Sequence, residues 1–318
     1  EMCIRDSYTI VETTVNSLKE LGAEPFIVSA MGSHGGGTEE GQREVLAGYG
    51  ITEERLGVPV VTTVDTVYLG NCANGRPVWF DRAAYEADLI VPINRVKLHT
   101  DFVGPIQSGL CKMLVIGLGN HKGCSAVHEE APEVFADAIE ETARLILQKA
   151  PVGFGIAILE NAYDKTYAVE AVPAEHLVER EKELVQIAKG NMPYIMLDEA
   201  DVIVCGAIGK DISGAGFDPN ILGRSSVLKQ FVLHIPRYQR LVLCDVTPAS
   251  HGNGIGVGLF DVITKKVAEQ LDLESMYANA IACNCLGDAS VPCTVDDEET
   301  AIRVALKCCR NIDRDHPR

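Results

Sequence analysis

Short apolar runs alternate along the chain with segments in which apolar residues recur at helical spacing. The first pattern predicts strands and the second predicts helices. Short runs rich in Val, Ile and Leu are typical of strands covered on both faces, and they predict strands at residues 24–30, 59–64, 89–93, 155–159, 201–206 and 240–246. Apolar residues at helical spacing predict helices at 9–21, 38–47, 131–149, 175–189, 260–270 and 298–308, with Thr38 as a capping residue. This alternation predicts an α/β fold with mostly parallel sheets.

The length of 318 residues is about twice that of a typical domain. The polar segment 190–193 separates a charged helix from a new strand, so we predict an N-terminal domain at 1–190 and a C-terminal α/β domain at 191–318. Ligands bind at the carboxyl ends of strands in such folds, and we expect an active-site cleft between the two domains. A strand normally opens an α/β domain, yet residues 1–7 lack strand alternation, so we expect the first strand to be missing.

Composition and charge restrict the class of protein. Lys and Arg number 28 against 45 Asp and Glu, and the resulting net charge of −17 repels phosphate backbones and anionic bilayers. We therefore expect neither nucleic acid nor a membrane as a partner, and the longest apolar stretches are too short to span a bilayer. Eleven cysteines, an odd number, are scattered over a large chain, which favours reduced thiols and a cytoplasmic location.

Two histidines follow predicted strands of the first domain. His34 lies in a glycine-rich turn at 28–37, and His99 lies in a polar loop within 92–102 that also holds Lys97. Imidazole titrates near neutral pH, so a pair of histidines that meet across a cleft suits proton transfer on opposite faces of one carbon. Each has a plainer interpretation, because His34 can be an exposed turn residue and His99 can be satisfied by the backbone.

The segment 103–119 places one lysine in an otherwise apolar, glycine-bounded stretch. A buried lysine is costly unless it is paired, deprotonated or used covalently, so Lys112 points to chemistry, although a lysine can also extend to the surface. Sixteen residues later stands His128, whose neutral imidazole can bind a metal.

The second domain has a glycine-rich polar loop at 207–220, directly after a predicted strand. Its spacing matches no phosphate-binding or dinucleotide fingerprint. We predict that Lys210, Asn220 and Arg224 help to bind substrate, together with Lys97 of the first domain.

Taken in order, these segments resemble the lactate racemase domain family over nearly the whole chain. His34 corresponds to a histidine in a Thr-Gly-Thr-His turn, and His99 to a histidine that precedes a Phe-x-Gly motif. Lys112 follows a Ser-Gly stretch, and His128 keeps the family's sixteen-residue spacing. The loop from His99 to Lys112 is longer than in the lactate enzymes, and the second-domain loop departs from their Gln/Lys pair, which leaves the substrate open.

The resemblance implies an isomerase, a racemase or epimerase of a small 2-hydroxy acid, with a nickel-pincer nucleotide as cofactor. In that interpretation Lys112 attaches the cofactor covalently through a thioamide, His128 ligates nickel, and His34 and His99 serve the two enantiomers. The cofactor-making enzymes are then expected partners, and the sequence does not indicate the oligomeric state. Two alternatives remain, a non-catalytic nickel or cofactor-binding protein of the same fold, and a zinc hydrolase that uses His34, His99 and His128.

Overall fold

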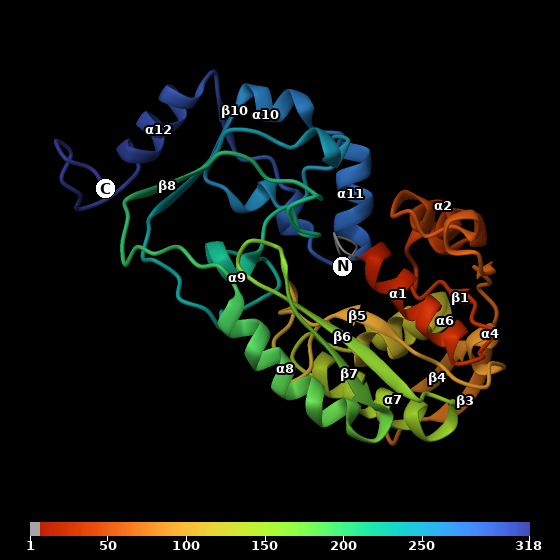
Figure 1. Ribbon diagram of the computed structural model, residues 1–318. Helices are drawn as coiled ribbons and strands as arrows, with labels where there is room; N and C mark the ends of the chain where they lie inside the picture. The colour runs from red at the N-terminus through yellow and green to blue at the C-terminus, as the bar shows by residue number, and fades with distance from the viewer. Residues whose placement is uncertain (1–6) are drawn as a thin grey trace. The chain divides into compact units, whose positions relative to one another are not determined.

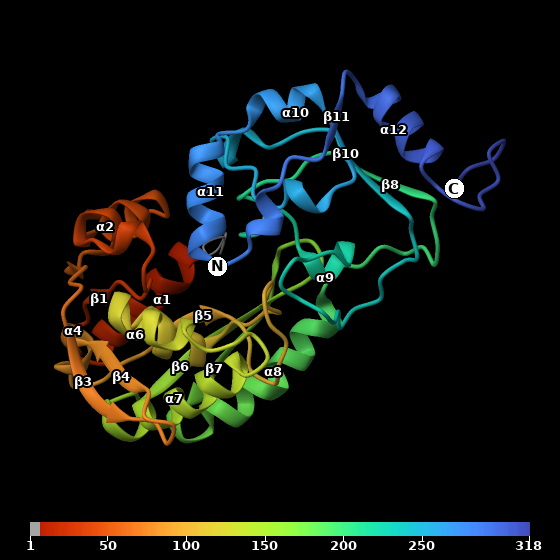
Figure 2. The same ribbon diagram turned by 180° about the vertical axis from the view of Figure 1, so that it is seen from behind.

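A computed structural model describes residues 7–318 of the chain. Backbone contacts divide it into two compact units, with the division between Met192 and Pro193. The N-terminal unit runs from red to green in Figure 1, and the C-terminal unit runs from green to blue. Figure 2 shows the same elements from behind. Our expectation of a missing first strand falls largely on residues 1–6, which lie outside the described residues.

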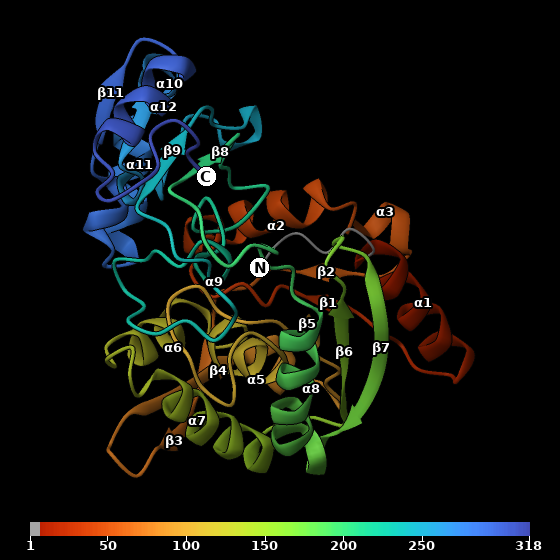
Figure 3. The same cartoon turned by 90° about the vertical axis from the view of Figure 1, so that its left-hand side faces the viewer.

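The N-terminal unit contains short sheets rather than one continuous sheet. Strands β1 (Ile27–Val28) and β2 (Val60–Val61) pair in parallel, and β3 (Thr66–Asn71) and β4 (Pro77–Asp81) form an antiparallel hairpin. In the third sheet, β6 (Phe154–Glu160) lies between β5 (Ile93–Arg95), which is parallel to it, and β7 (Thr166–Pro173), which is antiparallel. Figure 3 shows β6 and β7 as neighbouring arrows.

Helices surround these strands. They are α1 (Ser7–Glu20), α2 (Glu39–Gly48), α3 (Glu53–Leu56), α4 (Arg82–Tyr85), α5 (Leu110–Lys112), α6 (Asn120–His128), α7 (Phe135–Lys149) and α8 (Leu177–Asn191). The apolar side chains of α7 and α8 that helical spacing places on one face are buried, among them Ile139, Ile146 and Leu184. Leu110 of α5 is fully buried as well. The core of this unit therefore reaches directly beneath the segment that carries Lys112.

The C-terminal unit contains a four-stranded sheet in which every pair is parallel. The order is β11 (Cys293–Val295), β10 (Val262–Thr264), β9 (Arg240–Leu243) and β8 (Val202–Cys205). Its helices are α9 (Pro219–Leu222), α10 (Lys265–Gln270), α11 (Leu273–Ala282) and α12 (Glu298–Lys307). The side chains of Leu241, Val242 and Leu243 are fully buried, as expected for a strand covered on both faces.

The α/β class predicted from the sequence is confirmed, and Thr38 caps α2 by accepting a hydrogen bond from the Gly41 N–H. One predicted element was wrong in type. Residues 260–270 were predicted as a single helix, but β10 occupies 262–264 and α10 begins only at Lys265. Thr264 explains the change, because its hydroxyl accepts a hydrogen bond from the Val267 N–H and so marks the start of the helix.

Within the described part of the chain, no helix has the length and apolar character needed to cross a membrane. The ten cysteines that the structure describes are all free thiols.

Candidate functional site

A folded-back loop brings His99 next to Lys112. The backbone of Lys97 and Ser108 exchanges two hydrogen bonds, with N–O distances of 2.9 and 3.2 Å, which closes the loop between them. Gln107 completes the closure, because its Oε1 accepts from the His99 N–H at 2.8 Å while its Nε2 donates to the Gly104 carbonyl. The loop from His99 to Lys112 is thus closed by backbone and side-chain hydrogen bonds.

The two functional side chains of this region are in direct contact. His99 Nε2 lies 2.6 Å from Lys112 Nζ. The other ring nitrogen, Nδ1, accepts a hydrogen bond from the Asp101 N–H at 3.0 Å. The imidazole also stacks on Phe102, with 4.3 Å between ring centroids. The ring of His99 is therefore fixed by backbone and aromatic contacts, and its Nε2 is directed at the lysine.

Lys112 ends the short helix α5 and begins a π-helical turn at Met113–Gly117. The widened turn is closed by the Leu118 N–H, which donates to the Met113 carbonyl at 2.9 Å. Single π turns are costly and occur often at functional sites, because they displace side chains from regular helical positions. On its N-terminal side the helix is held by Asn94, whose side chain donates to the Gly109 carbonyl at 2.8 Å.

His128 lies at the end of α6 and joins the same neighbourhood through aromatic rings. Its ring meets Phe135 edge-on at 5.1 Å, and Phe135 contacts Phe102, the ring on which His99 stacks. His128 Nδ1 lies 2.7 Å from the Cys124 carbonyl oxygen, one helical turn earlier. Because a carbonyl only accepts, Nδ1 carries the proton, and Nε2 keeps the lone pair that a metal would bind.

Cys124 is a further contact of His128, and its Sγ lies 3.4 Å from the ring. Burial by itself raises the pKa of the Cys124 thiol, but the hydrogen bond to His128 and the charge on that ring hold the pKa below its ordinary value. In return, the hydrogen bond to Cys124 raises the pKa of His128, although burial opposes the change. The thiol and the imidazole thus stabilise each other's charged forms.

The turn that carries His34 packs against the π turn and α6. A Cβ at Gly32 would lie 2.9 Å from the Ile116 carbonyl oxygen and 3.5 Å from Cys124. Ser33 Oγ lies 3.8 Å from Cys124 Sγ. Gln42 supports this turn through its fully buried side-chain amide. The amide oxygen accepts a hydrogen bond from the Ser29 hydroxyl, and the amide nitrogen donates to the Gly32 carbonyl.

His34 itself is exposed, and its orientation is defined. Nδ1 lies 2.8 Å from the Met31 carbonyl oxygen, so that nitrogen is the donor and Nε2 is free to accept a proton. Gly35 makes this turn possible, because its φ is +64° and a Cβ there would come within 2.5 Å of the backbone of Gly41. A glycine is therefore required directly after the histidine.

In the C-terminal unit, the side chains of Lys210 and Asn220 bond to residues of the same unit. Lys210 Nζ donates to the Gly214 carbonyl at 2.6 Å and also bonds to Asn279. Asn220 is buried, and its backbone and side-chain amides both donate to Asp218 at the start of α9. The substrate-binding roles of Lys210, Asn220 and Lys97 stay predictions.

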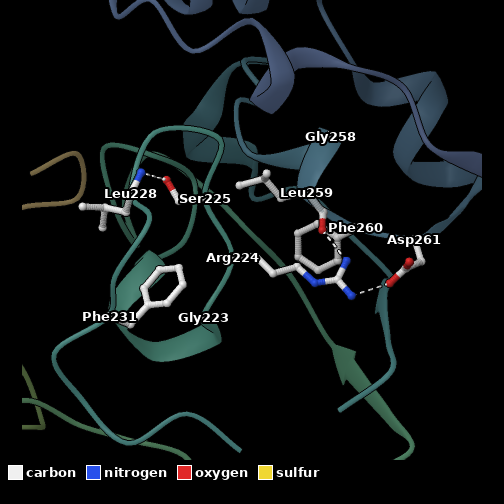
Figure 4. Close-up of a pocket in the computed structure, with 9 residues that line it drawn as sticks. All are labelled: Gly223, Arg224, Ser225, Leu228, Phe231, Gly258, Leu259, Phe260 and Asp261. Atoms are coloured by element: carbon white, nitrogen blue, oxygen red, sulfur yellow. Dashed lines mark hydrogen bonds and ion pairs between the residues drawn. The ribbon is translucent and has the colours of Figure 1, made fainter. Parts of the chain in front are cut away.

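Arg224 lines a cavity of about 460 Å³ in the C-terminal unit, which Figure 4 shows in close-up. Its guanidinium donates to the Leu259 carbonyl at 2.8 Å and pairs with Asp261 at 2.7 Å. The same group lies over the Tyr238 ring, 5.3 Å from its centroid. A substrate carboxylate at Arg224 would therefore compete with Asp261, and this predicted role is also untested.

No group of three or more His, Cys, Asp or Glu side chains that could hold a metal ion exists among residues 7–318. Sequence reasoning missed several residues that shape the site, namely Asn94, Phe102, Gln107, Cys124 and Phe135. Of these, Cys124 had a local signal, because it precedes His128 by one helical turn.

The N-terminal part of the chain is similar in sequence to a known family. Residues 4–137 match the family model of the lactate racemase N-terminal domain, and this segment contains His34, His99, Lys112 and His128. The N-terminal part of the chain is thus similar to the lactate racemase N-terminal domain family.

The solved structures that are similar include the following two. The lactate racemase apoprotein from Thermoanaerobacterium thermosaccharolyticum is 13% identical with a TM-score of 0.50, and the match covers 91% of this chain and 72% of that one. A protein from Thermotoga maritima is 12% identical with a TM-score of 0.39, and the match covers 62% of each chain. The first likeness shows a shared fold. No curated protein matches the sequence.

Proposed function

We propose that the protein is an isomerase that racemises or epimerises a small 2-hydroxy acid with a nickel-pincer nucleotide as its cofactor. The contact of 2.6 Å between Lys112 Nζ and His99 Nε2, inside a lactate racemase N-terminal domain, carries this proposal. It supports the proposal because an amine for covalent attachment and an imidazole for proton transfer must lie side by side at such a centre.

The residues of the N-terminal unit fit this cofactor. Lys112 would hold it covalently, and His128 would ligate nickel through Nε2, since Nδ1 is engaged by the Cys124 carbonyl. When bound, the cofactor supplies the acceptor and donor for the substrate's Cα hydride.

The chain's own part in the reaction is to move the hydroxyl proton. His34 is prepared to act as a base, because its Nδ1 faces the Met31 carbonyl and its Nε2 has a free lone pair. His99 accepts the Asp101 N–H at Nδ1, so in the neutral ring Nε2 carries the proton. The neutral rings thus present an acceptor at His34 and a hydrogen-bond donor at His99. A ring that has taken up a proton and become an imidazolium is the acid that returns it, so the two histidines exchange the roles of base and acid when the opposite enantiomer reacts.

Two other functions compete with this one. A zinc hydrolase would need about three protein ligands, and the described residues offer no such group, so this alternative has less support. A carrier protein that binds the cofactor without turnover would use the same Lys112 and His128.

Expression beside the cofactor-making enzymes, followed by metal analysis and chiral chromatography of a panel of 2-hydroxy acids, separates these functions. The proposal expects nickel in the purified protein and racemisation of at least one acid. Nickel without racemisation of any acid would identify a carrier, and zinc with hydrolytic activity would identify a hydrolase.

A further inference from the structure

A buried carboxylate lies beneath the turn that carries Lys112. Glu181 of α8 is completely buried, and its Oε2 accepts a hydrogen bond from the Cys111 N–H at 2.9 Å. The Leu110 N–H also favours the ionised carboxylate. These two amides open a helix, where N–H groups have no partner within the helix. Glu181 therefore caps the Lys112 helix from a different helix of the fold.

The backbone beside Glu181 is shaped to admit the carboxylate. A Cβ at position 109 would lie 2.6 Å from the Glu181 carboxyl carbon and 2.7 Å from each of its oxygens, so any residue other than glycine would displace it. On the other side, Asn94 holds the Gly109 carbonyl at 2.8 Å. The start of the helix is thus fixed by a buried amide on one side and a buried carboxylate on the other.

Two potential nucleophiles, Cys111 and Lys112, are adjacent in the chain, and their surroundings differ. Cys111 is fully buried, and its thiol faces Glu181. Burial, followed by the negative charge of Glu181, raises the pKa of Cys111 well above its ordinary value and keeps the thiol unreactive. Lys112 is only partly buried, and its Nζ reaches His99.

We propose that Glu181 is a positioning residue that makes Lys112, and not Cys111, the nucleophile that this turn presents for covalent attachment. The inference rests on the proposed function. Successive helical residues point about 100° apart, so fixing the amides of Leu110 and Cys111 fixes both side-chain directions at once. A thiol is the stronger nucleophile when ionised, and an exposed Cys111 would compete with the lysine.

The attachment is a condensation without redox change. A bond forms between Lys112 Nζ and the carbon of a thiocarboxylic acid, and the bond from that carbon to oxygen breaks. The oxygen leaves as water with two protons, one of them from the amine that becomes the thioamide N–H and one from the acid. No oxidant or reductant is required.

The test uses the full chain without cofactor. Native protein is treated separately with iodoacetamide, which alkylates thiols, and with an N-hydroxysuccinimide acetate, which acetylates amines, and peptide masses give the rate at each residue. Wild type is expected to react at Lys112 and to be protected at Cys111. In Glu181→Ala, Cys111 alkylation and amide exchange at Leu110 and Cys111 should each accelerate at least tenfold.

Two variants and one internal reference make the result specific. Glu181→Gln keeps the shape and one acceptor oxygen, so it should restore much of the protection of Cys111. Glu183→Ala alters an exposed residue of the same helix and should behave as wild type. Cys72, buried elsewhere in the unit, should stay protected in each variant. If Cys72 is also alkylated in the Ala variant, that variant has unfolded and Glu181→Asp takes its place. Its shorter side chain withdraws the carboxylate from the Cys111 N–H, so alkylation and amide exchange should again accelerate.

Unchanged alkylation of Cys111 and unchanged amide exchange in a folded Glu181→Ala or Glu181→Asp variant would overturn the positioning role. These readouts need no cofactor, so they are independent of the proposed function. If the rates change as expected but protein made beside the cofactor-making enzymes carries no adduct, the proposed function fails. Glu181 would then still determine that Lys112, and not Cys111, is the reactive side chain of this turn.

Discussion

Lys112 and Lys210 look alike in the sequence, because each lies in a polar or glycine-bounded segment downstream of a strand. Their surroundings differ. Lys112 Nζ contacts an imidazole at 2.6 Å, on a helix start that is fixed by buried Asn94 and Glu181. Lys210 Nζ instead bonds to the Gly214 carbonyl, which closes its own loop, and to Asn279, which ties that loop to α11.

The comparison teaches that a lysine's partner indicates its role better than its sequence context does. An ammonium group bonded to a carbonyl and an amide holds a loop in shape, whereas an amine beside a fixed imidazole is placed for proton transfer or covalent chemistry. We therefore assign the chemistry to the Lys112 region and a loop-closing contact to Lys210. The predictions below test this contrast.

The largest expected effect is on turnover. Replacing His34 or His99 by Ala should lower racemisation about a hundredfold or more, since positioned acid and base groups contribute about 10² to 10⁴. Cofactor loading should survive, because Lys112 and His128 are retained. The exposed His176 provides the control, and His176→Ala should keep full activity. Wild-type rates in both single variants, with every acid of the panel, would remove the two histidines from the mechanism.

The next effect concerns stability. Burial raises the pKa of Glu181 from its ordinary 4.5 to about 7. The folded protein then keeps a proton that the unfolded chain has already lost, so stability falls as the pH rises from 4.5 through about 7. At ~1.4 kcal/mol for each pH unit, the loss is about 3 kcal/mol.

Glu181→Gln lacks this titration, so wild type should lose stability relative to the variant between pH 4.5 and pH 8. Urea unfolding of both proteins across this range measures the difference, and other titrating groups cancel in the comparison. A constant difference in unfolding free energy would show that Glu181 titrates normally.

A smaller effect is expected at the metal. His128→Ala should keep the covalent adduct and lose nickel about 10- to 100-fold more readily, because one imidazole ligand is gone while Lys112 is intact. Nickel content after dialysis against a chelator, beside the intact mass, measures both properties. Equal nickel retention in the variant and in wild type would exclude His128 as a ligand.

Much of the fold was predictable from apolar spacing, and the exceptions have physical causes. The hairpin of β3 and β4 was missed although Asn74-Gly75, a strong turn signal, lies between its strands. β10 has three residues and continues directly into α10, so the combined pattern resembled one helix. The antiparallel β7 was missed because it is an edge strand of alternating half-buried and exposed residues, so it lacks the continuous Val, Ile and Leu run that indicated the other strands.

The site was predictable only where the signal was local. His34, His99, Lys112 and His128 could be identified because their motifs and spacing lie within short segments. The contact between His99 and Lys112 depends on the backbone pairing of Lys97 with Ser108, which no sequence pattern marks. Glu181 lies 70 residues from Cys111 in the chain, and a glutamate in a charged helix gives no indication that it is buried.

The most direct test of the account is the intact mass of the protein after expression beside the cofactor-making enzymes, with Lys112→Ala and Lys210→Ala in parallel. We expect the wild type and Lys210→Ala to carry the same covalent adduct and Lys112→Ala to carry none. An adduct that persists in Lys112→Ala, or one that disappears in a folded Lys210→Ala, would contradict the assignment of covalent chemistry to Lys112.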